Sequence, residues 1–353
     1  MQRQGPAFFA FVDKMVPRLA GDAAAMKETT MRIPLSLVLA GGLATLSACD
    51  RPAVLGETPA QDGWELAWSD EFDGTAIDRA KWDFDIDCWG GGNNEQQCYT
   101  DRAENASIVD GKLVITARKE DFTGPALPPY LAADAEDPDA TASQPFTSAR
   151  MVTRGKAAWK YGKIEVRAKL PQGQGTWPAI WMMPEDQVYG RWAQSGEIDI
   201  MEAVNLGVEC DNGCEEGGEN TILGTLHFGG GWPDNDLAST EFNYPPVLDD
   251  GFHTFGVIWS EGRFIWTVDG RKFAEKKAGD WYTTESEDPN APFDQRFHLI
   301  LNLAIGGGLP EERALGGVSP DGFPKQMEID WVRVWQCGPD PATGSGCVLE
   351  GDQ

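Results

Sequence analysis

Apolar and polar residues alternate along much of the chain with the period of two that is typical of β-strands. The alternation is clear in Trp64–Trp68, in Lys163–Ala168 and in Met327–Trp335, where β-branched and aromatic residues are frequent. A helical period is nearly absent, and the sequence has no internal repeat. These patterns predict one large all-β domain. We expect a sandwich of two antiparallel sheets, with a groove for a chain-like ligand where one sheet curves.

Two segments interrupt this pattern. Ser69–Gly74 follows the first predicted strand and has the composition of a turn. Residues 121–147 are rich in Asp, Ala and Pro and have no period. We therefore expect an exposed loop there that overhangs the groove.

The N-terminal part of the chain has the features of an export signal. Ile33–Ala48 is apolar, follows the basic residues Lys27 and Arg32, and is shorter than the roughly 20 residues that span a bilayer. It is therefore interpreted as the core of a signal peptide. Residues 1–25 precede the possible start sites Met26 and Met31, so residues 1–48 are assigned to an upstream extension and the signal.

The end of this apolar stretch, Leu46–Cys49, resembles a bacterial lipobox. The resemblance implies that Cys49 is lipidated and becomes the new N-terminus, with residues 49–62 as a tether to the folded domain. We then expect an exported protein anchored to a bacterial membrane, in the periplasm or at the cell surface. The alternative is an ordinary secretory signal followed by a chance cysteine, which predicts a secreted protein.

The charge of the chain excludes one class of partner. The sequence has 29 Lys and Arg against 56 Asp and Glu, a formal net charge of −27. Nucleic acid binding depends on clustered cations that neutralise phosphates, so this surface suits a neutral polymer better. We expect a monomer with a strongly solvated acidic surface.

Apart from Cys49, the cysteines fall into three close pairs. An exported chain permits disulfides, and local pairing needs no long-range coincidence, although the sequence leaves the connectivity open. Zinc is the rival interpretation, but the three histidines are scattered. The favoured pairs are Cys88 with Cys98, Cys210 with Cys214, and Cys337 with Cys347.

One strand-like segment carries three carboxylates: Glu197, Asp199 and Glu202. Cleavage of a glycosidic bond needs one carboxyl to protonate the leaving oxygen and another to attack carbon or activate water. In a regular strand Glu197 and Asp199 share a face, whereas Glu202 would point into the core. An unpaired charge there is costly, so the segment predicts a β-bulge near Met201 that returns Glu202 to the carboxylate face.

Three neighbouring carboxylates repel one another, and the repulsion is tolerable when one of them stays protonated. We assign Glu197 as the nucleophile, Glu202 as the general acid and then base, and Asp199 as the middle group that tunes Glu197. A bland alternative is an acidic edge strand that faces water.

Glu197–Glu202 is similar to the signature of glycoside hydrolase family 16, in the bulged form of the laminarinases, which are endo-β-1,3-glucanases. The resemblance covers roughly residues 63–336 and implies a concanavalin-like β-jelly roll with a concave substrate cleft. The catalytic domain is therefore expected at 63–337, and the tail 338–353 is tied back by Cys337 with Cys347. The chain departs from the family at Cys98, in place of an aromatic residue, and at Ala149, in place of Gly. The other matching segments are Trp68–Gly74, Asn93–Thr100, Tyr161–Lys169, Trp177–Pro184 and Leu226–Pro233.

A glucan groove needs flat aromatic platforms edged by hydrogen-bonding groups. Candidate platforms are Trp89, Trp177, Trp181 and Trp232, each with the alternative of an ordinary core tryptophan. The resemblance places Trp177 near the scissile bond. It also implies that Arg150 and Asn93 contact substrate hydroxyls and that His227 lies at the catalytic centre, whereas His253 is interpreted as structural.

The family resemblance further implies a structural calcium ion that joins the first and last strands. The matching positions are Glu71, the carbonyl of Gly111 and Asp330, and hard oxygen ligands suit this ion. Asp330 has the alternative of an ion pair with Arg333 or with another neighbour. No cofactor is expected for catalysis.

The sequence thus predicts a retaining endo-β-1,3-glucanase that acts on laminarin-type glucan. One alternative within the family is an enzyme for mixed-linkage β-1,3-1,4-glucan or for agar. An alternative of another class is a non-catalytic β-glucan-binding surface protein. Such proteins have lost the catalytic glutamates, whereas Glu197 and Glu202 are both present here.

Overall fold

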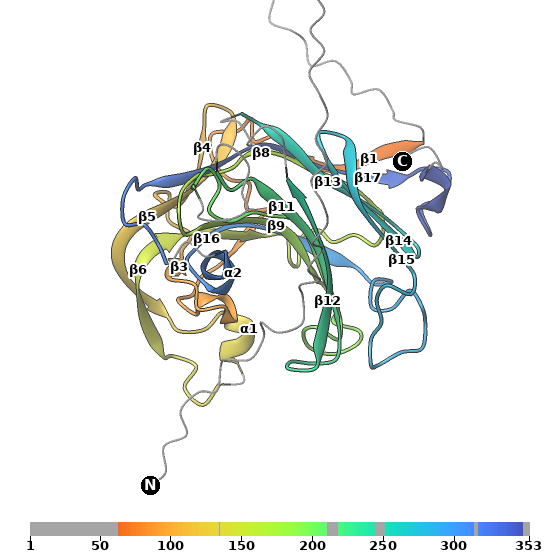
Figure 1. Cartoon of the computed structure of the whole chain (residues 1–353), viewed down its shortest axis with the longest axis horizontal. Coiled ribbons are helices and arrows are strands. Elements are labelled where there is room, and N and C mark those ends of the chain that lie inside the picture. Colours follow the sequence, from red (N-terminus) through yellow and green to blue (C-terminus); the bar gives the residue numbers. More distant parts are fainter. Residues whose placement is uncertain (1–62, 134, 210–217, 244–250, 314–316, 349–353) are drawn as a thin grey trace, which may run out of the picture. The chain divides into compact units, whose positions relative to one another are not determined.

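The computed structural model describes residues 63–133, 135–209, 218–243, 251–313 and 317–348. Within these ranges the regular structure is almost entirely strand and forms two stacked sheets (Figure 1). Four short helices complete it: η1 (Gly90–Gly92), α1 (Pro129–Ala132), α2 (Gly308–Glu312) and η2 (Ser345–Cys347). In the described part of the chain, no helix has the length and apolar character needed to cross a membrane.

The larger sheet has ten strands and covers the back of the other. Its strands are β1 (Trp64–Asp70), β3 (Gln97–Tyr99), β4 (Ala106–Val109), β5 (Lys112–Pro125), β6 (Thr141–Ser148), β8 (Gly162–Lys169), β13 (His253–Ser260), β14 (Arg263–Val268), β15 (Arg271–Lys277) and β17 (Lys325–Cys337). They follow the order β15-β14-β13-β8-β17-β5-β6-β3, with β1 paired to β17 and β4 to β5. The pairing is antiparallel as predicted, except that β3 and β6 run parallel.

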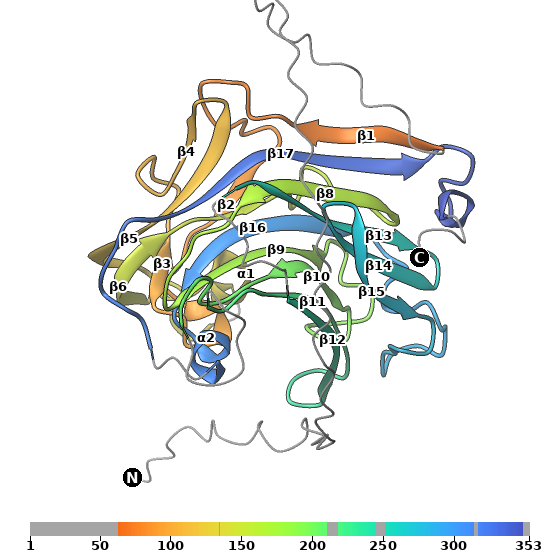
Figure 2. The ribbon, with the colours of Figure 1, turned by 45° about the horizontal axis from the view of Figure 1, so that its top comes forward.

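The smaller sheet has seven strands: β2 (Asp83–Asp85), β7 (Arg150–Val152), β9 (Thr176–Pro184), β10 (Glu197–Glu202), β11 (Thr221–Gly229), β12 (Asn235–Asn243) and β16 (Phe297–Ile305). They follow the order β12-β11-β10-β9-β16-β7-β2, and all pairs are antiparallel. Figure 2 shows that these strands curve, with their hollow side turned away from the ten-stranded sheet. The all-β jelly-roll sandwich predicted from the sequence is therefore confirmed.

The hydrophobic core lies between the two sheets. In β8 the alternate residues Ile164, Val166 and Ala168 have no exposed surface, and they belong to one large apolar cluster that both sheets share. Trp259 and Trp266 are equally inaccessible in the same cluster. Burial of a large apolar side chain stabilises a fold by about 1.5–3 kcal/mol. The period-two pattern of the sequence thus reports the inner faces of the sheets.

The prediction of an exposed loop at 121–147 is wrong. β5 continues to Pro125 and β6 begins at Thr141, and these two residues face each other in an antiparallel hairpin. The connection therefore shrinks to the tip, which carries α1. Exposed and half-buried residues alternate in this part of β5, so pairing with β6 defines the strand where the hydrophobic pattern does not.

Two of the three predicted disulfides are confirmed: Cys88–Cys98 and Cys337–Cys347. The third pair, Cys210 with Cys214, lies outside the described residues. Cys347 belongs to η2, so the second disulfide ties the tail back to the end of β17 as expected. The predicted signal peptide and the lipid attachment site at Cys49 also lie outside the described part of the chain.

Candidate active site

β10 carries the three carboxylates at the middle of the curved sheet, between β9 and β11. Ile198 and Ile200 are buried in the core between the sheets. Glu197 and Asp199 alternate with them and therefore point to the opposite, concave face. This arrangement confirms the face predicted from the sequence and contradicts the acidic edge strand, because β10 has a neighbour on each side.

A β-bulge places Glu202 with the other two carboxylates. Against β11, Asp199 faces Thr225, and a regular strand would then bring Met201 opposite Leu223. Instead Glu202 faces Leu223, so β10 contains one extra residue at this point. The register with β9 shifts between Asp199 and Met201 as well. Met201 is fully buried in the core, and the predicted bulge is confirmed.

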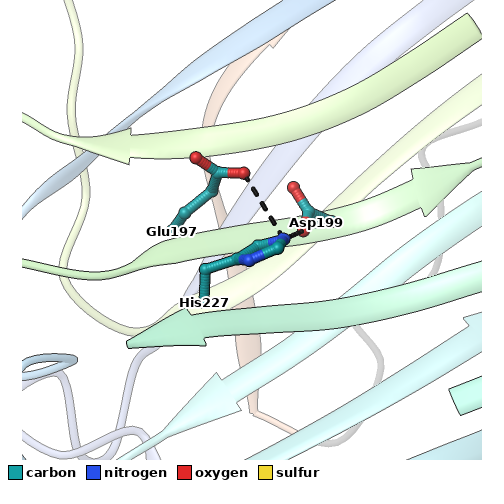
Figure 3. A group of neighbouring side chains, drawn as sticks. All are labelled: Glu197, Asp199 and His227. Atoms are coloured by element: carbon teal, nitrogen blue, oxygen red, sulfur yellow. Dashed lines mark ion pairs between the residues drawn. The ribbon is translucent and has the colours of Figure 1, made fainter. Parts of the chain in front are cut away.

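His227 on β11 lies against the first two carboxylates (Figure 3). Its Nε2 atom is 3.2 Å from Oδ2 of Asp199 and 3.7 Å from Oε1 of Glu197. The pairing of Glu197 with His227 in the β10–β11 register explains this proximity. Trp192 donates a hydrogen bond of 2.7 Å from its indole N–H to Oε2 of Glu197. Glu197 is thus held from two sides by groups that favour its anionic form.

The two carboxylates favour the positively charged form of His227. Burial and, after it, the charge of Glu197 raise the pKa of Asp199 to about 6. Burial also raises the pKa of Glu197, while the charge of His227 and the Trp192 hydrogen bond oppose the rise. Burial alone would lower the pKa of His227, but the hydrogen bond to Asp199 and the charge of Glu197 raise it to about 9. His227 is therefore protonated at neutral pH and balances a neighbouring carboxylate.

Glu202 has a different environment. Its Oε1 atom accepts a hydrogen bond of 2.9 Å from the indole N–H of Trp177. Burial and, after it, the charge of Asp199 raise the pKa of Glu202 to about 8. A carboxyl with this pKa holds its proton at neutral pH, as a general acid must. Trp177 is almost completely buried on β9. Its hydrogen bond places it beside Glu202, the position near the scissile bond that the family resemblance implies.

Trp181 and Arg150 continue the polar surface across the sheet. Trp181 faces Asp199 in the β9–β10 register, and its indole N–H donates a hydrogen bond of 2.6 Å to Asn302 on β16. The guanidinium carbon of Arg150 lies 5.3 Å from the Trp181 ring centre and 4.5 Å from that of Tyr99. The candidate Trp181 therefore lies on the concave face and outside the hydrophobic core.

The remaining predicted substrate residues lie in loops. Trp89 and Trp232 have exposed fractions of 36% and 58%, which suit platforms that a ligand can reach. Asn93 is exposed after η1 and donates a hydrogen bond of 3.3 Å to Glu95. The contact connects Asn93 to Arg150, because Glu95 also lies 4.0 Å from the Arg150 guanidinium. His253 pairs with Asp269, in agreement with a structural role.

Sequence reasoning missed Trp192, Glu95 and Asn302. Trp192 is in the loop before β10, five positions from Glu197, and only the fold turns its ring toward that carboxylate. Glu95 is buried and accepts hydrogen bonds from Gln97 and Tyr99. The only sequence signal for Glu95 was its place in Asn93–Thr100, the segment on which part of the family resemblance rests.

The two carboxylates of the predicted calcium site are engaged with arginines. Glu71 accepts two hydrogen bonds, of 2.9 and 2.8 Å, from Arg333, and Asp330 pairs with Arg167. The alternative for Asp330 was an ion pair with Arg333 or a neighbour, and the structure gives it the neighbouring Arg167, on β8. A calcium ion would have to replace a guanidinium at each carboxylate, so its binding stays a prediction. Among the described residues, one group of three acidic and histidine side chains has ligand atoms that all lie within 4.8 Å of one another, namely Glu197, Asp199 and His227.

The fold and the carboxylate-lined strand define a β-jelly-roll glycoside hydrolase. A family model described as "Beta-porphyranase A-D, GH16 domain" matches residues 64–337. The chain is 39% identical over 291 residues to "Glucan endo-1,3-beta-glucosidase A1" of Niallia circulans, covering 79% of this chain and 39% of that protein. It is 40% identical over 281 residues to a "Beta-glucanase" of Rhodothermus marinus, covering 77% of this chain and 85% of the relative. The chain belongs to glycoside hydrolase family 16.

The structural comparison agrees. The X-ray structure of the laminarinase from Rhodothermus marinus aligns with a TM-score of 0.61 and 38% identity, over 77% of this chain and 97% of that one. The chain spans only about two fifths of the Niallia circulans protein, but most of the Rhodothermus enzyme.

Proposed function

We propose that this protein is a retaining endo-β-1,3-glucanase. The observation that carries the proposal is the bulged β10 strand, which brings Glu197 and Glu202 to one concave face with Asp199 between them. Glu202, with a pKa of about 8, holds its proton at neutral pH. Hydrolysis with retention requires such a pair, in which one carboxylate attacks and the other carboxyl donates a proton.

In the first step a carboxylate oxygen of Glu197 attacks the anomeric carbon and forms a covalent ester with the sugar. The bond from this carbon to the leaving oxygen breaks, and Glu202 transfers its proton to that oxygen. In the second step Glu202, now a carboxylate, removes a proton from water, whose oxygen attacks the same carbon and releases Glu197. Both residues return to their initial protonation states.

Asp199 and His227 tune the two glutamates. Glu197 becomes neutral in the ester, which removes a negative charge next to Asp199 and His227. The charge of His227 favours the anionic form of Glu197 before the attack, because its Nε2 lies 3.7 Å from that carboxylate. Trp192 and Trp177 hold one oxygen of each glutamate, so the orientation of both side chains is set before substrate binds.

The choice of β-1,3-glucan rests on the relatives and on the bulge. Relatives at 39% and 40% identity carry the names of endo-1,3-β-glucosidases, and the aligned structure is a laminarinase. Within the family the bulged form of the signature is typical of laminarinases. The matched family model is described by a porphyranase, so a galactan is the main alternative substrate.

The test is the release of reducing ends from laminarin, lichenan, agarose and porphyran at equal mass concentration. We expect the highest rate on laminarin, with a product formed first in the β-anomeric form by proton NMR. Activity on agarose or porphyran without activity on laminarin would overturn the proposal that β-1,3-glucan is the substrate. Glu197→Gln should keep laminarin affinity while hydrolysis falls by several orders of magnitude. If Glu197→Gln kept its rate, the nucleophile assignment would be wrong.

We also propose that the mature protein is exported and anchored through a lipid on Cys49. The support is the apolar stretch Ile33–Ala48 and the lipobox-like end at Cys49. In a bacterial host, the full-length chain should carry a diacylglyceryl-modified Cys49 in the membrane fraction. Cys49→Ala should move the enzyme to the soluble fraction, and an unchanged distribution would contradict the anchor.

A further inference from the structure

The concave face continues beyond the substrate residues discussed above, to the edge strand β2. Asp85 on β2 faces Arg150 on β7 in register, so both side chains lie on this face. Asp85 is 2% exposed and forms an ion pair with Arg154. The guanidinium carbon of Arg154 in turn lies 5.3 Å from the ring centre of Tyr130, on α1.

A continuous row of contacts connects this edge to the reaction site. It begins with Asp199 opposite Trp181 and passes through the hydrogen bond from Trp181 to Asn302. Asn302 faces Arg150 in the β16–β7 register, and Arg150 faces Asp85. From β10 to β2 the row crosses four strand spacings, a path of about 19 Å at about 4.8 Å for each spacing. A polysaccharide that crosses the strands from the carboxylates would reach Asp85 several sugar units away.

Tyr130 comes to this edge because its hairpin is bound to the neighbouring loop. The N–H of Cys88 donates a hydrogen bond of 2.7 Å to the carbonyl of Pro125, at the end of β5. Gln144 on β6 donates a hydrogen bond of 3.3 Å back to the carbonyl of Cys88. In Figure 1, α1 and β12 lie on opposite sides of the hollow of the curved sheet. The hairpin tip therefore stands at one end of the concave face.

The side chains here have the properties of a sugar platform. Tyr130 has an exposed fraction of 47% although the Arg154 guanidinium covers part of its ring. Arg154, which lies against this ring, keeps 38% of its side chain exposed. An exposed aromatic face with charged hydrogen-bonding groups at its edge is the combination that binds sugar rings.

We propose that Tyr130, supported by Arg154 and Asp85, forms a distal sugar-binding subsite at the β2 end of the concave face. This subsite extends the glucan-binding function proposed above and rests on it. The Tyr130 ring stacks on the apolar face of a sugar, and Arg154 holds the ring in place while its N–H groups reach the sugar hydroxyls. Chains long enough to reach Tyr130 gain affinity, so the subsite sets a preference for longer substrates.

The experiment compares Tyr130→Ala, Tyr130→Phe and Val109→Ala with the wild type on β-1,3-gluco-oligosaccharides of increasing length and on laminarin. Val109 is a matched control, because it is 46% exposed and lies on β4 of the other sheet. For Tyr130→Ala we expect kcat/KM to fall about tenfold on long chains, mainly through KM, and to be unchanged on the shortest chains that are cleaved. Tyr130→Phe should keep most of the activity on long chains, because the ring remains.

A loss in Tyr130→Ala that is equal at all chain lengths, or no loss relative to Val109→Ala on laminarin, would overturn the subsite. The wild type, assayed on the same oligosaccharides and laminarin, tests the proposed β-1,3-glucanase activity itself. If it leaves all β-1,3-glucans intact, the proposed function fails, and the subsite is tested with oligosaccharides of the polymer that the wild type cleaves. The dependence of the Tyr130→Ala effect on chain length therefore tests the subsite separately from the proposed function.

Discussion

The indole N–H of Trp266, on β14, donates a hydrogen bond of 2.8 Å to the main-chain carbonyl of Asp199, on β10. The bond joins the two sheets at the residue where the bulge begins. Gly224 on β11 gives the Trp266 ring its space, since a Cβ atom there would lie 2.6 Å from the ring. The back sheet therefore takes part in shaping the strand that carries the catalytic carboxylates.

We expect Trp266→Phe to lose both stability and activity. The substitution leaves the Asp199 carbonyl buried without its donor, which costs about 1–3 kcal/mol in unfolding free energy. The freed bulge should also displace Glu202, with a fall in kcat of about tenfold. Urea denaturation and initial rates on laminarin measure the two effects.

The matched control is Trp259→Phe. Trp259 is as fully buried as Trp266 in the same core, but its indole nitrogen has no hydrogen-bond partner among the described residues. It should lose stability through the cavity alone and keep the wild-type kcat. Equal losses of kcat in both variants would contradict the role of the Trp266 hydrogen bond.

The pH dependence of kcat/KM should reflect opposite requirements of the two glutamates. Glu202 must hold its proton, so the rate falls as pH rises through about 8. His227→Gln removes the positive charge that lowers the pKa values of Glu197 and Glu202. Both limbs of the profile should therefore move to higher pH, by about one unit. Unchanged limbs in His227→Gln would show that the imidazole is uncharged in the free enzyme.

Glu202 should also make the fold less stable at alkaline pH. Its pKa is about 8 in the fold against an ordinary value of 4.5, so between these values the folded state binds the proton that the unfolded state releases. Stability then decreases as pH rises through this range. Glu202→Gln has no proton to lose, so its Tm should exceed that of the wild type by a margin that grows from pH 5 to pH 8. The exposed Glu104→Gln serves as the control, and a margin independent of pH would contradict the assignment.

Calcium removal tests the predicted site at Glu71, Gly111 and Asp330. If the free calcium concentration is 100 times the Kd of the site, exhaustive chelation should reduce the unfolding free energy by about 2.7 kcal/mol. Added calcium should restore the lost stability. Asp330→Asn should abolish this response, whereas Arg167→Gln breaks the same ion pair and keeps the carboxylate. An unchanged Tm after chelation would contradict calcium binding and leave Glu71 and Asp330 with their arginine partners alone.

The bulge was predictable because charge and periodicity conflict within a few residues. Glu202 has the wrong parity for a strand that also contains Glu197, and an unpaired carboxylate in the core is costly, so one extra residue is the local solution. The apolar inner faces of the sheets were predictable for a related reason, because every second residue must be buried. Both inferences need only neighbours along the chain.

The hairpin and several site residues could not be predicted in this way. The outer part of β5 is defined by pairing with β6, and its side chains carry no regular apolar face. Trp192 and Asn302 act through contacts with Glu197 and Trp181 that the fold alone creates. The Arg333 and Arg167 partners of Glu71 and Asp330 likewise depend on how the strands meet.

The place of β17 in the sheet has a consequence for biosynthesis. β17 lies between β8 and β5 and also pairs with β1, so three strands made earlier depend on a partner that is made last. Until the residues up to Cys337 have been synthesised, the edges of these strands stay open and the back sheet is incomplete. We therefore expect the back sheet to close only after the last strand has been made, so the order of synthesis makes β17 the final step of folding.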